Sequence, residues 1–172
     1  MPIHISAEVQ IAAPPERVWA VLTDLSSYRQ WHPVFVSVNG ELAAGSKLTI
    51  TTTHPTTGRT MNAKVTVQTV EPDTELRWAS KMAGLPISDR RFLLSPSSGG
   101  TLLVQAGTYR GLGGGRGRGT AKSIGRIQDA YAAINQAIKQ QAESRPDLPK
   151  GRHDRALPGC RPGAHDAGHP PP

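Results

Sequence analysis

The side chains best suited to chemistry in this sequence lie on two predicted strands, at 87–95 and 101–109. On the first, strand alternation places Arg90 on the same face as the apolar Phe92, so we expect its guanidinium to point into the interior. An inward guanidinium is costly to desolvate, and we expect it to meet a carboxylate, carbonyl groups or an anionic group of a ligand. The alternative is an internal ion pair with Asp89 or another acid, or a rim position in water.

The second strand adds a phenol and an amide to the same interior. Leu103 and Tyr109 are expected to point inward, and alternation carries Gln105 and Gly107 to the same face. A guanidinium can polarise a carbonyl while a phenol moves a proton. Tyr109 is therefore a candidate catalytic residue beside Arg90.

Two histidines deserve comparison with these groups, since imidazole titrates near neutral pH. His32 lies between Trp31 and Pro33 and is the third catalytic candidate, although the sequence places no second titratable group to orient it. His54 shares a strand face with Ile50 but lies at the strand end beside a turn, so we expect it to be exposed.

The sequence predicts neither a metal site nor a cofactor. His153, His165 and His169 lie in the C-terminal segment without the spacing of a metal motif. The single cysteine, Cys160, excludes an intrachain disulfide, a cysteine zinc cluster and a CxxC redox pair.

The chain carries a net charge of +7, and part of it is concentrated in one region. Such a cluster can attract phosphates or anionic membranes, and the alternative is a solvated face. We expect no nucleic-acid partner, because no nucleic-acid-binding motif is present. The clustered basic residues are Arg110, Arg116, Arg118, Lys122 and Arg126.

No run approaches the ~20 apolar residues of a membrane span, and the N-terminus does not resemble a signal peptide, so we expect a soluble, cytoplasmic protein.

Hydrophobic periodicity indicates the elements that position these side chains. Residues 8–11 alternate as a strand, and prolines then introduce a short amphipathic helix with Val18 and Leu22 on one face. Alternating runs between 47 and 109, separated by turn residues, are typical of an antiparallel meander. Apolar residues then recur every three or four positions, which predicts a long helix from about Thr120 to Ser144.

In order and spacing these elements resemble the polyketide cyclase/dehydrase and lipid-transport family, within the START-like helix-grip superfamily often labelled SRPBCC. The resemblance covers residues 3–145 and implies an α+β fold, in which seven antiparallel strands curve around a long C-terminal helix. Two short helices join the first two strands. The motifs are IAAPPERVWAVLTDLSSYRQWHP, GELAAGSKLTI, VEPDTELRW, SDRRFLLSP and GGTLLVQAGTYRGL, followed by a helix ending in NQAIKQQAE.

We therefore predict one helix-grip domain at 1–145. Residues 146–172 hold seven of the fifteen prolines and few large apolar side chains, so we predict a disordered tail rich in Pro, Gly, Arg and His. The Gly/Arg-rich run at 111–119 fits no phosphate-binding motif and is too short for an RGG-like RNA contact. We predict a flexible flap over the entrance of a pocket, or else a loose loop.

The family also implies a deep, mainly apolar pocket between sheet and helix for a lipid-like, aromatic or polyketide-like ligand, with His32 at its mouth. Relatives often carry a histidine at position 90 and an acid at position 107. Arg90 and Gly107 put that proton transfer in doubt here, and we expect the glycine to enlarge the cavity or bend its strand. The residues predicted to bind ligand, with core packing as the alternative, are Tyr28, Trp31, Ile50, Met61, Val65, Trp78, Met82, Arg90, Phe92, Leu103, Gln105, Tyr109, Ile127 and Tyr131.

Two functions are consistent with these observations. The first is binding or carriage of a hydrophobic small molecule without catalysis. The second is a polyketide cyclase, aromatase or dehydratase, in which Arg90 polarises a carbonyl and Tyr109 or His32 moves a proton. The sequence leaves the ligand and the oligomeric state open.

Overall fold

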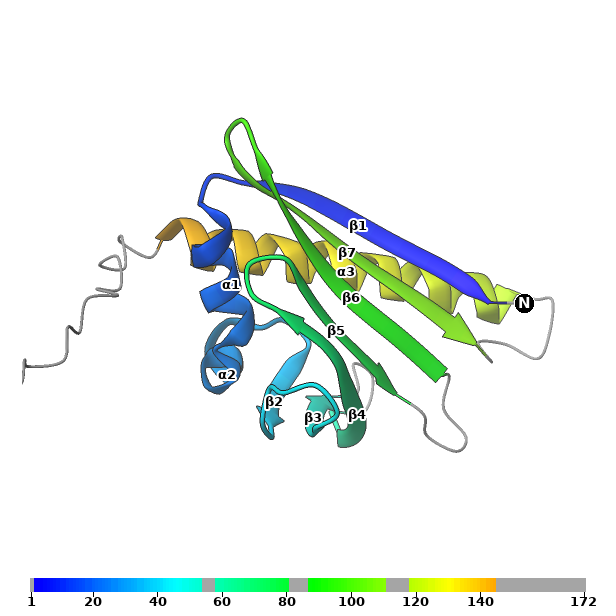
Figure 1. Ribbon diagram of the computed structural model, residues 1–172. Coiled ribbons are helices and arrows are strands. Elements are labelled where there is room, and N and C mark those ends of the chain that lie inside the picture. Colours follow the sequence, from blue (N-terminus) through cyan, green and yellow to red (C-terminus); the bar gives the residue numbers. More distant parts are fainter. Residues whose placement is uncertain (1, 54–57, 81–86, 111–117, 145–172) are drawn as a thin grey trace, which may run out of the picture.

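A computed structural model describes residues 2–53, 58–80, 87–110 and 118–144 (Figure 1). It contains a seven-stranded antiparallel sheet with the order β1-β7-β6-β5-β4-β3-β2. The strands are β1 (Ile3–Ile11), β2 (Phe35–Asn39), β3 (Lys47–Thr53), β4 (Thr60–Glu71), β5 (Glu75–Ser80), β6 (Ile87–Ser97) and β7 (Gly100–Arg110). The helices are α1 (Pro15–Thr23), a 3₁₀ turn (Leu25–Ser27), α2 (Tyr28–Trp31) and α3 (Arg118–Ser144). The predicted helix-grip fold is confirmed.

Helix α1 begins as the prolines predict. Pro15 occupies the first turn, where its missing N–H has no intrahelical partner, and Glu16 adds a carboxylate near the positive end of the helix dipole. The helix buries Val18, Val21 and Leu22. This apolar face anchors α1 against the core and fixes where the following turn and α2 meet the sheet.

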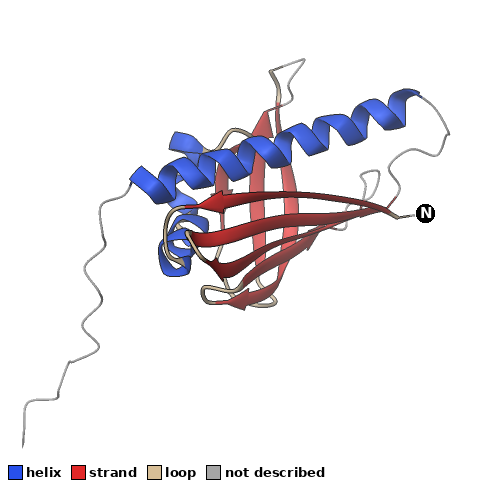
Figure 2. Cartoon of the chain, turned by 90° about the horizontal axis from the view of Figure 1, so that it is seen from above, coloured by secondary structure: helices blue, strands red, loops and turns tan. Residues whose placement is uncertain are grey.

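Helix α3 crosses the sheet in Figure 2 and is fastened to β1 near its C-terminal end. Ile134, Ile138 and Ala142 are buried on its inner face. Lys139 Nζ donates to the Gln10 carbonyl at 2.6 Å, and the Ala12 N–H donates to Glu143 Oε1 at 2.8 Å. The last turns of α3 are thus tied to the connection between β1 and α1.

The interior contains two apolar clusters. The larger one joins α1, the inner faces of the strands and the C-terminal half of α3. The smaller one consists of Ile5, Tyr109 and Tyr131, with Ile124 and Ile127 packed against it. The buried polar residues among those described are Thr101, Gln105 and Asn135.

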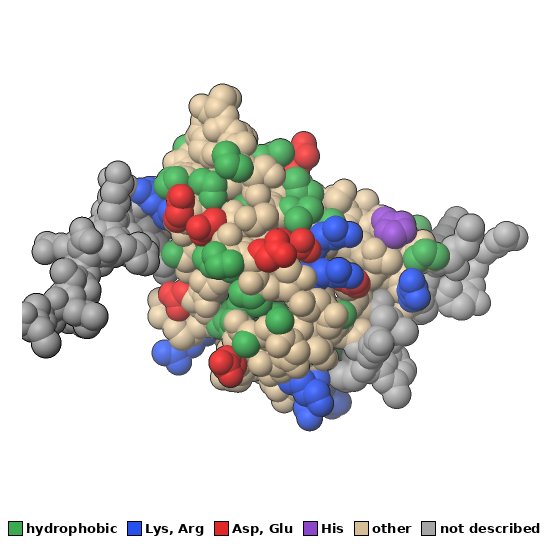
Figure 3. Space-filling view, in the orientation of Figure 1, with side chains coloured by type: hydrophobic (Ala, Val, Ile, Leu, Met, Phe, Trp, Pro, Cys, Tyr) green, Lys and Arg blue, Asp and Glu red, His purple; other side chains and the backbone are tan. Residues whose placement is uncertain are grey.

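The outer face of the sheet carries charges of both signs (Figure 3). Arg77 and Asp89 form a bidentate ion pair there, with N–O distances of 2.9 and 2.6 Å. Asp89 therefore pairs with Arg77 on the outer face and not with Arg90. The internal Arg90–Asp89 pair considered above is wrong.

Several sequence predictions fall on residues that lie outside the described ones: His54, Met82, the tail from 146, and most of the glycine-rich run. Of that run, Arg118 and Gly119 belong to α3 and not to a loop, because the helix begins two residues earlier than predicted. No helix in the described part of the chain is long and apolar enough to cross a membrane.

Candidate functional site

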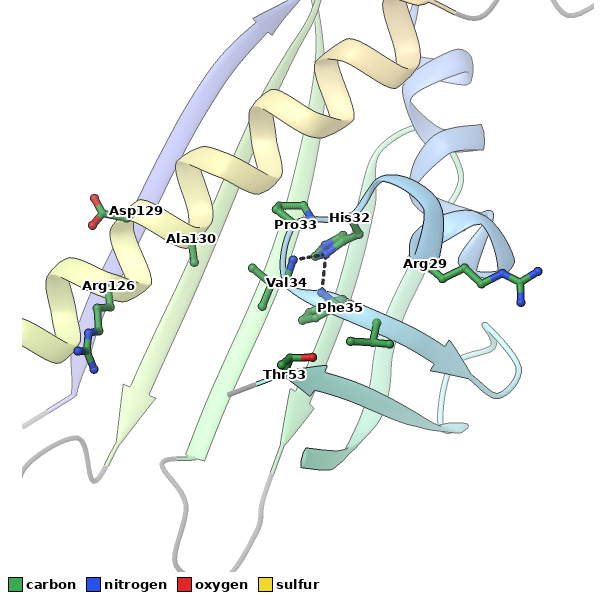
Figure 4. A pocket seen from close by; sticks show the side chains of 10 residues that line it. Arg29, His32, Pro33, Val34, Phe35, Thr53, Arg126, Asp129 and Ala130 are labelled. Atoms are coloured by element: carbon green, nitrogen blue, oxygen red, sulfur yellow. Dashed lines mark hydrogen bonds between the residues drawn. The ribbon is translucent and has the colours of Figure 1, made fainter. Parts of the chain in front are cut away.

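A pocket of about 540 Å³ opens between α3 and the segment that joins α2 to β2 (Figure 4). Ala130 and Val34 face each other across it, whereas Arg29 and Asp129 extend outward at its two ends. The lining residues are Arg29, His32, Pro33, Val34, Phe35, Val36, Thr53, Arg126, Asp129 and Ala130. The pocket exists because α3 packs mainly on β1, at one edge of the sheet, and stands apart from β2 at the other edge.

One wall of the pocket is built from stacked rings. His32 lies 4.2 Å from Phe35, centroid to centroid, with an interplanar angle of 8°. Tyr28 stacks on His32 at 5.0 Å and 14°. Tyr28 is in turn fixed by α1, because its hydroxyl donates a hydrogen bond to the Leu22 carbonyl at 2.7 Å. The C-terminal part of α1 therefore positions Tyr28, and through it the His32 and Phe35 rings that line the pocket.

Arg90 lies behind the pocket, between Phe35, which lines it, and Tyr131 on α3. Its guanidinium carbon lies 5.7 Å from the ring centroid of Phe35 on β2 and 4.7 Å from that of Tyr131 on α3. Its Nη2 donates to the Tyr109 hydroxyl at 3.3 Å. Its Nη1 is buried and has no hydrogen-bond partner among the described residues. The residue as a whole is half-buried, and among the described residues its charge is compensated by rings and a phenol and not by a carboxylate.

The two phenols beside Arg90 form a hydrogen-bonded pair. The Tyr109 and Tyr131 oxygens lie 2.7 Å apart, and either one can be the donor. Only one of the two phenolic hydrogens is used in this bond, so the other is left for an acceptor. Burial, the largest influence, raises the pKa of the Tyr131 phenol above its ordinary value, so it stays protonated. Arg90 and the phenols therefore offer hydrogen-bond donors in excess of acceptors.

His32 is a donor and not a base. Its Nδ1 accepts the N–H groups of Val34 at 3.2 Å and Phe35 at 2.9 Å, so the neutral ring carries its proton on Nε2. Burial, assisted by the charge of Arg90, lowers the pKa of His32 to about 3. The proton-moving role considered for His32 thus conflicts with its geometry, since its second nitrogen already holds the β2 backbone.

Gly107 provides the space for Tyr131. A Cβ at this position would collide with Tyr131 Oη, and it would lie 3.1 Å from both Tyr131 Cζ and Tyr109 Cε2. Gly107 is regularly paired with Arg90 and Ile5 in the sheet. The sequence suggested that this glycine enlarges the cavity or bends its strand. It does neither, because Tyr131 occupies the space and the strand pairing is regular. The hydroxyl of Tyr131 fills the space.

Two buried amides lie deeper in the interior. Gln105 is fully buried, and neither its Nε2 nor its Oε1 has a partner among the described residues. Asn135 is 1% exposed, and its Nδ2 donates to the Ala7 carbonyl at 3.0 Å while its Oδ1 is unpartnered. Ala7 and Gln105 are paired across β1 and β7, so both amides lie at the same level of the sheet.

Most residues predicted to bind ligand face the interior, but none of the described ones lines the pocket itself. Met61 is 47% exposed at the end of β4, and Trp31 and Ile127 are half-buried. His32 is the one catalytic candidate that lines the pocket. The buried members are Tyr28, Ile50, Val65, Trp78, Phe92, Leu103, Gln105, Tyr109 and Tyr131.

Sequence reasoning missed the segment from Val34 to Val36 and the α3 residues Arg126, Asp129 and Ala130. The one signal in the sequence that could have indicated the pocket is Ala130, a small side chain next to the buried Tyr131 on α3. In the described part of the chain, no group of three or more His, Cys, Asp or Glu residues is arranged to hold a metal ion.

Solved structures share this fold at low identity. Protein MLL2253 of Mesorhizobium loti is 22% identical, with a TM-score of 0.63 over 85% of this chain and 100% of that chain. Ara h 8.0201 is 13% identical, with a TM-score of 0.68 over 84% and 100% of the two chains. The di-domain ARO/CYC StfQ of the steffimycin biosynthetic pathway is 12% identical, with a TM-score of 0.65 over 83% of this chain and 50% of that chain.

These likenesses establish the fold alone, and a comparison with curated proteins finds no match. The family comparison reaches further, because a model described as polyketide cyclase / dehydrase and lipid transport matches residues 2–143. The match covers every element of the sheet and nearly all of α3. The chain belongs to the polyketide cyclase / dehydrase and lipid transport family.

Proposed function

We propose that this protein binds a hydrophobic small molecule that carries a carboxylate or carbonyl group, between the sheet and α3. The observation that carries the proposal is the Arg90 guanidinium, which has a buried, unpartnered Nη1 and no carboxylate partner among the described residues. A buried cation is costly unless it is paired, and an acceptor oxygen of a ligand compensates for this cost.

The surroundings of Arg90 favour the same kind of ligand. The phenol pair has a hydrogen left to donate, and His32 presents its Nε2–H, so the polar groups near the pocket are mainly donors. Apolar rings and aliphatic side chains make up the remaining wall. At the rim the two cations Arg29 and Arg126 outnumber the one acid, Asp129, and the net positive charge attracts an anion.

Two fluorescent probes that differ by one anionic group test the proposal. 8-Anilinonaphthalene-1-sulfonate and neutral N-phenyl-1-naphthylamine share the same ring system, and the sulfonate stands for the ligand carboxylate. We expect Arg90→Gln to weaken binding of the sulfonate roughly 10- to 100-fold, the range of a charge-assisted hydrogen bond, with little effect on the neutral probe. Arg77→Gln is the matched control, because it removes a cation from the outer face of the sheet.

Equal losses for both probes would show that Arg90 only supports the fold of the pocket. Failure of both probes to bind the unaltered protein would contradict a hydrophobic site altogether. Thermal unfolding of each variant shows whether a lost signal comes from a lost fold.

A cyclase, aromatase or dehydratase activity is the second candidate, favoured by the phenol pair that lies beside the cation. Arg90 would polarise a carbonyl, and Tyr109 would give or take a proton. Incubation with a linear poly-β-ketone distinguishes the two functions by mass spectrometry. A binding protein leaves the compound as it is in the protein-free control. A cyclase gives an isomer of the same mass with a different chromatographic retention time, and a dehydratase or aromatase gives a product lighter by one water.

A further inference from the structure

The interior contains a second set of unused hydrogen-bonding groups, separate from the donors around Arg90. Gln105 has a free amide N–H₂ and a free carbonyl oxygen, and Asn135 has a free carbonyl oxygen. Their exposed fractions are 0% and 1%. Most buried polar side chains in proteins have partners, so an amide with both ends unpaired needs an explanation.

Thr101 on the same strand shows what a structural polar residue looks like in this core. It is fully buried on the inner face of β7, and its hydroxyl donates to the Ala13 carbonyl at 2.7 Å. Asn135 is half satisfied, because its Nδ2 holds the β1 backbone at Ala7. Gln105 holds nothing among the described residues, so support of the fold does not account for it.

The amides lie close to the proposed binding group. Arg90 pairs with Gly107 and Phe92 pairs with Gln105 across β6 and β7, so Arg90 and Gln105 are diagonal neighbours. Such neighbours have backbones about 7–8 Å apart and point to the same face. Arg90 also reaches the pocket wall at Phe35. Neither amide lines the described pocket, and the step from the guanidinium to the amides is about the length of two fused rings.

We infer that Gln105 and Asn135 form a second polar subsite, which takes a hydroxyl or carbonyl group of the ligand. The inference rests on the proposed function and narrows the ligand class: the ligand is oxygenated at two places, with one group for Arg90 and another for the amides. A simple fatty acid does not satisfy both. Because the fold has already desolvated the Gln105 amide, a ligand that pairs with it gains affinity without a new desolvation cost on the protein.

Gln105→Met tests the inference in two ways, because methionine has nearly the same length, no hydrogen-bond donor and only a weakly accepting sulfur. Removal of an unpaired buried amide is expected to raise the midpoint of thermal unfolding by about 3–8 °C. Thr101→Val is the matched control, and it is expected to lower the midpoint because it breaks the bond to Ala13. An unchanged or lower midpoint for Gln105→Met would mean that a buried water already satisfies the amide, and it would overturn the inference.

Calorimetric titration with 2-naphthoate and 6-hydroxy-2-naphthoate supplies the second readout. We expect the unaltered protein to bind the hydroxylated probe about 5- to 10-fold more tightly, which is the range of one neutral hydrogen bond, and Gln105→Met to bind both equally. Equal affinities in the unaltered protein would overturn the second subsite and leave the proposed function intact. No binding of either probe would overturn both.

Discussion

The fit between Gly107 and Tyr131 gives a prediction with a built-in control. In Gly107→Ala, the added methyl group collides with Tyr131 Oη, which is the rigid end of a fully buried ring. The ring must move, so the Tyr109–Tyr131 hydrogen bond breaks and its stacking with Arg90 is disturbed. Overpacking costs about 1–3 kcal/mol. The broken bond adds about 1 kcal/mol.

We therefore expect Gly107→Ala to lower the free energy of unfolding by about 2–4 kcal/mol, a fall of roughly 5–15 °C in the midpoint. Urea unfolding followed by circular dichroism measures the free energy. Tyr131→Phe removes the colliding oxygen, so in this background the alanine is expected to cost about 1.5 kcal/mol less. The relief is partial, because Cζ remains 3.1 Å from the new methyl group. Additive costs in the double variant would refute the proposed collision.

Two further predictions concern pH and the C-terminal tail. Because the folded pKa of His32 lies near 3, well below the ordinary histidine value of about 6.5, the unfolded chain binds the extra proton first, and stability falls as the pH drops below about 6.5. Between pH 7 and pH 5 this amounts to about 2 kcal/mol of unfolding free energy. His32→Asn keeps an acceptor for the β2 backbone and cannot titrate, so it should lose that much less over this interval; parallel losses would contradict the role of His32. Truncation after Ser144 is expected to leave the unfolding midpoint within about 2 °C, because residues 146–172 have too few apolar side chains to add a core. A much larger fall in calorimetry would show that the tail contributes to the folded domain.

Local patterns in the sequence were sufficient for the helices and strands, whereas their arrangement was predicted from the resemblance to a known family. The prolines before Val18 indicated where α1 starts, and the spacing of Tyr131, Ile134 and Ile138 indicated the buried face of α3. These signals depend on a few neighbouring residues, for which helix geometry fixes the relative directions of the side chains. The same holds for the inward face of β7.

The site depends on contacts that the sequence does not encode locally. The pocket arises where α3 and the 33–36 segment stand apart, and the fit of Tyr131 against Gly107 depends on how far α3 lies above β7. The pairing of Asp89 with Arg77 follows from the register of β5 and β6. Met61 was assigned to the correct face, but its strand extends beyond the core, so the side chain is exposed.

The shape of the guanidinium allows Arg90 to serve the fold and a ligand at once. Its carbon lies over the rings of Phe35 and Tyr131, 5.7 and 4.7 Å from their centroids, and a guanidinium directs its hydrogen bonds within its own plane. Nη2 uses one part of that edge for Tyr109, and Nη1 leaves the other part unused. An anionic group that approaches along the edge therefore breaks none of these contacts. A lysine ammonium has neither faces nor a fork, so at this position it would have to choose between the rings and the ligand.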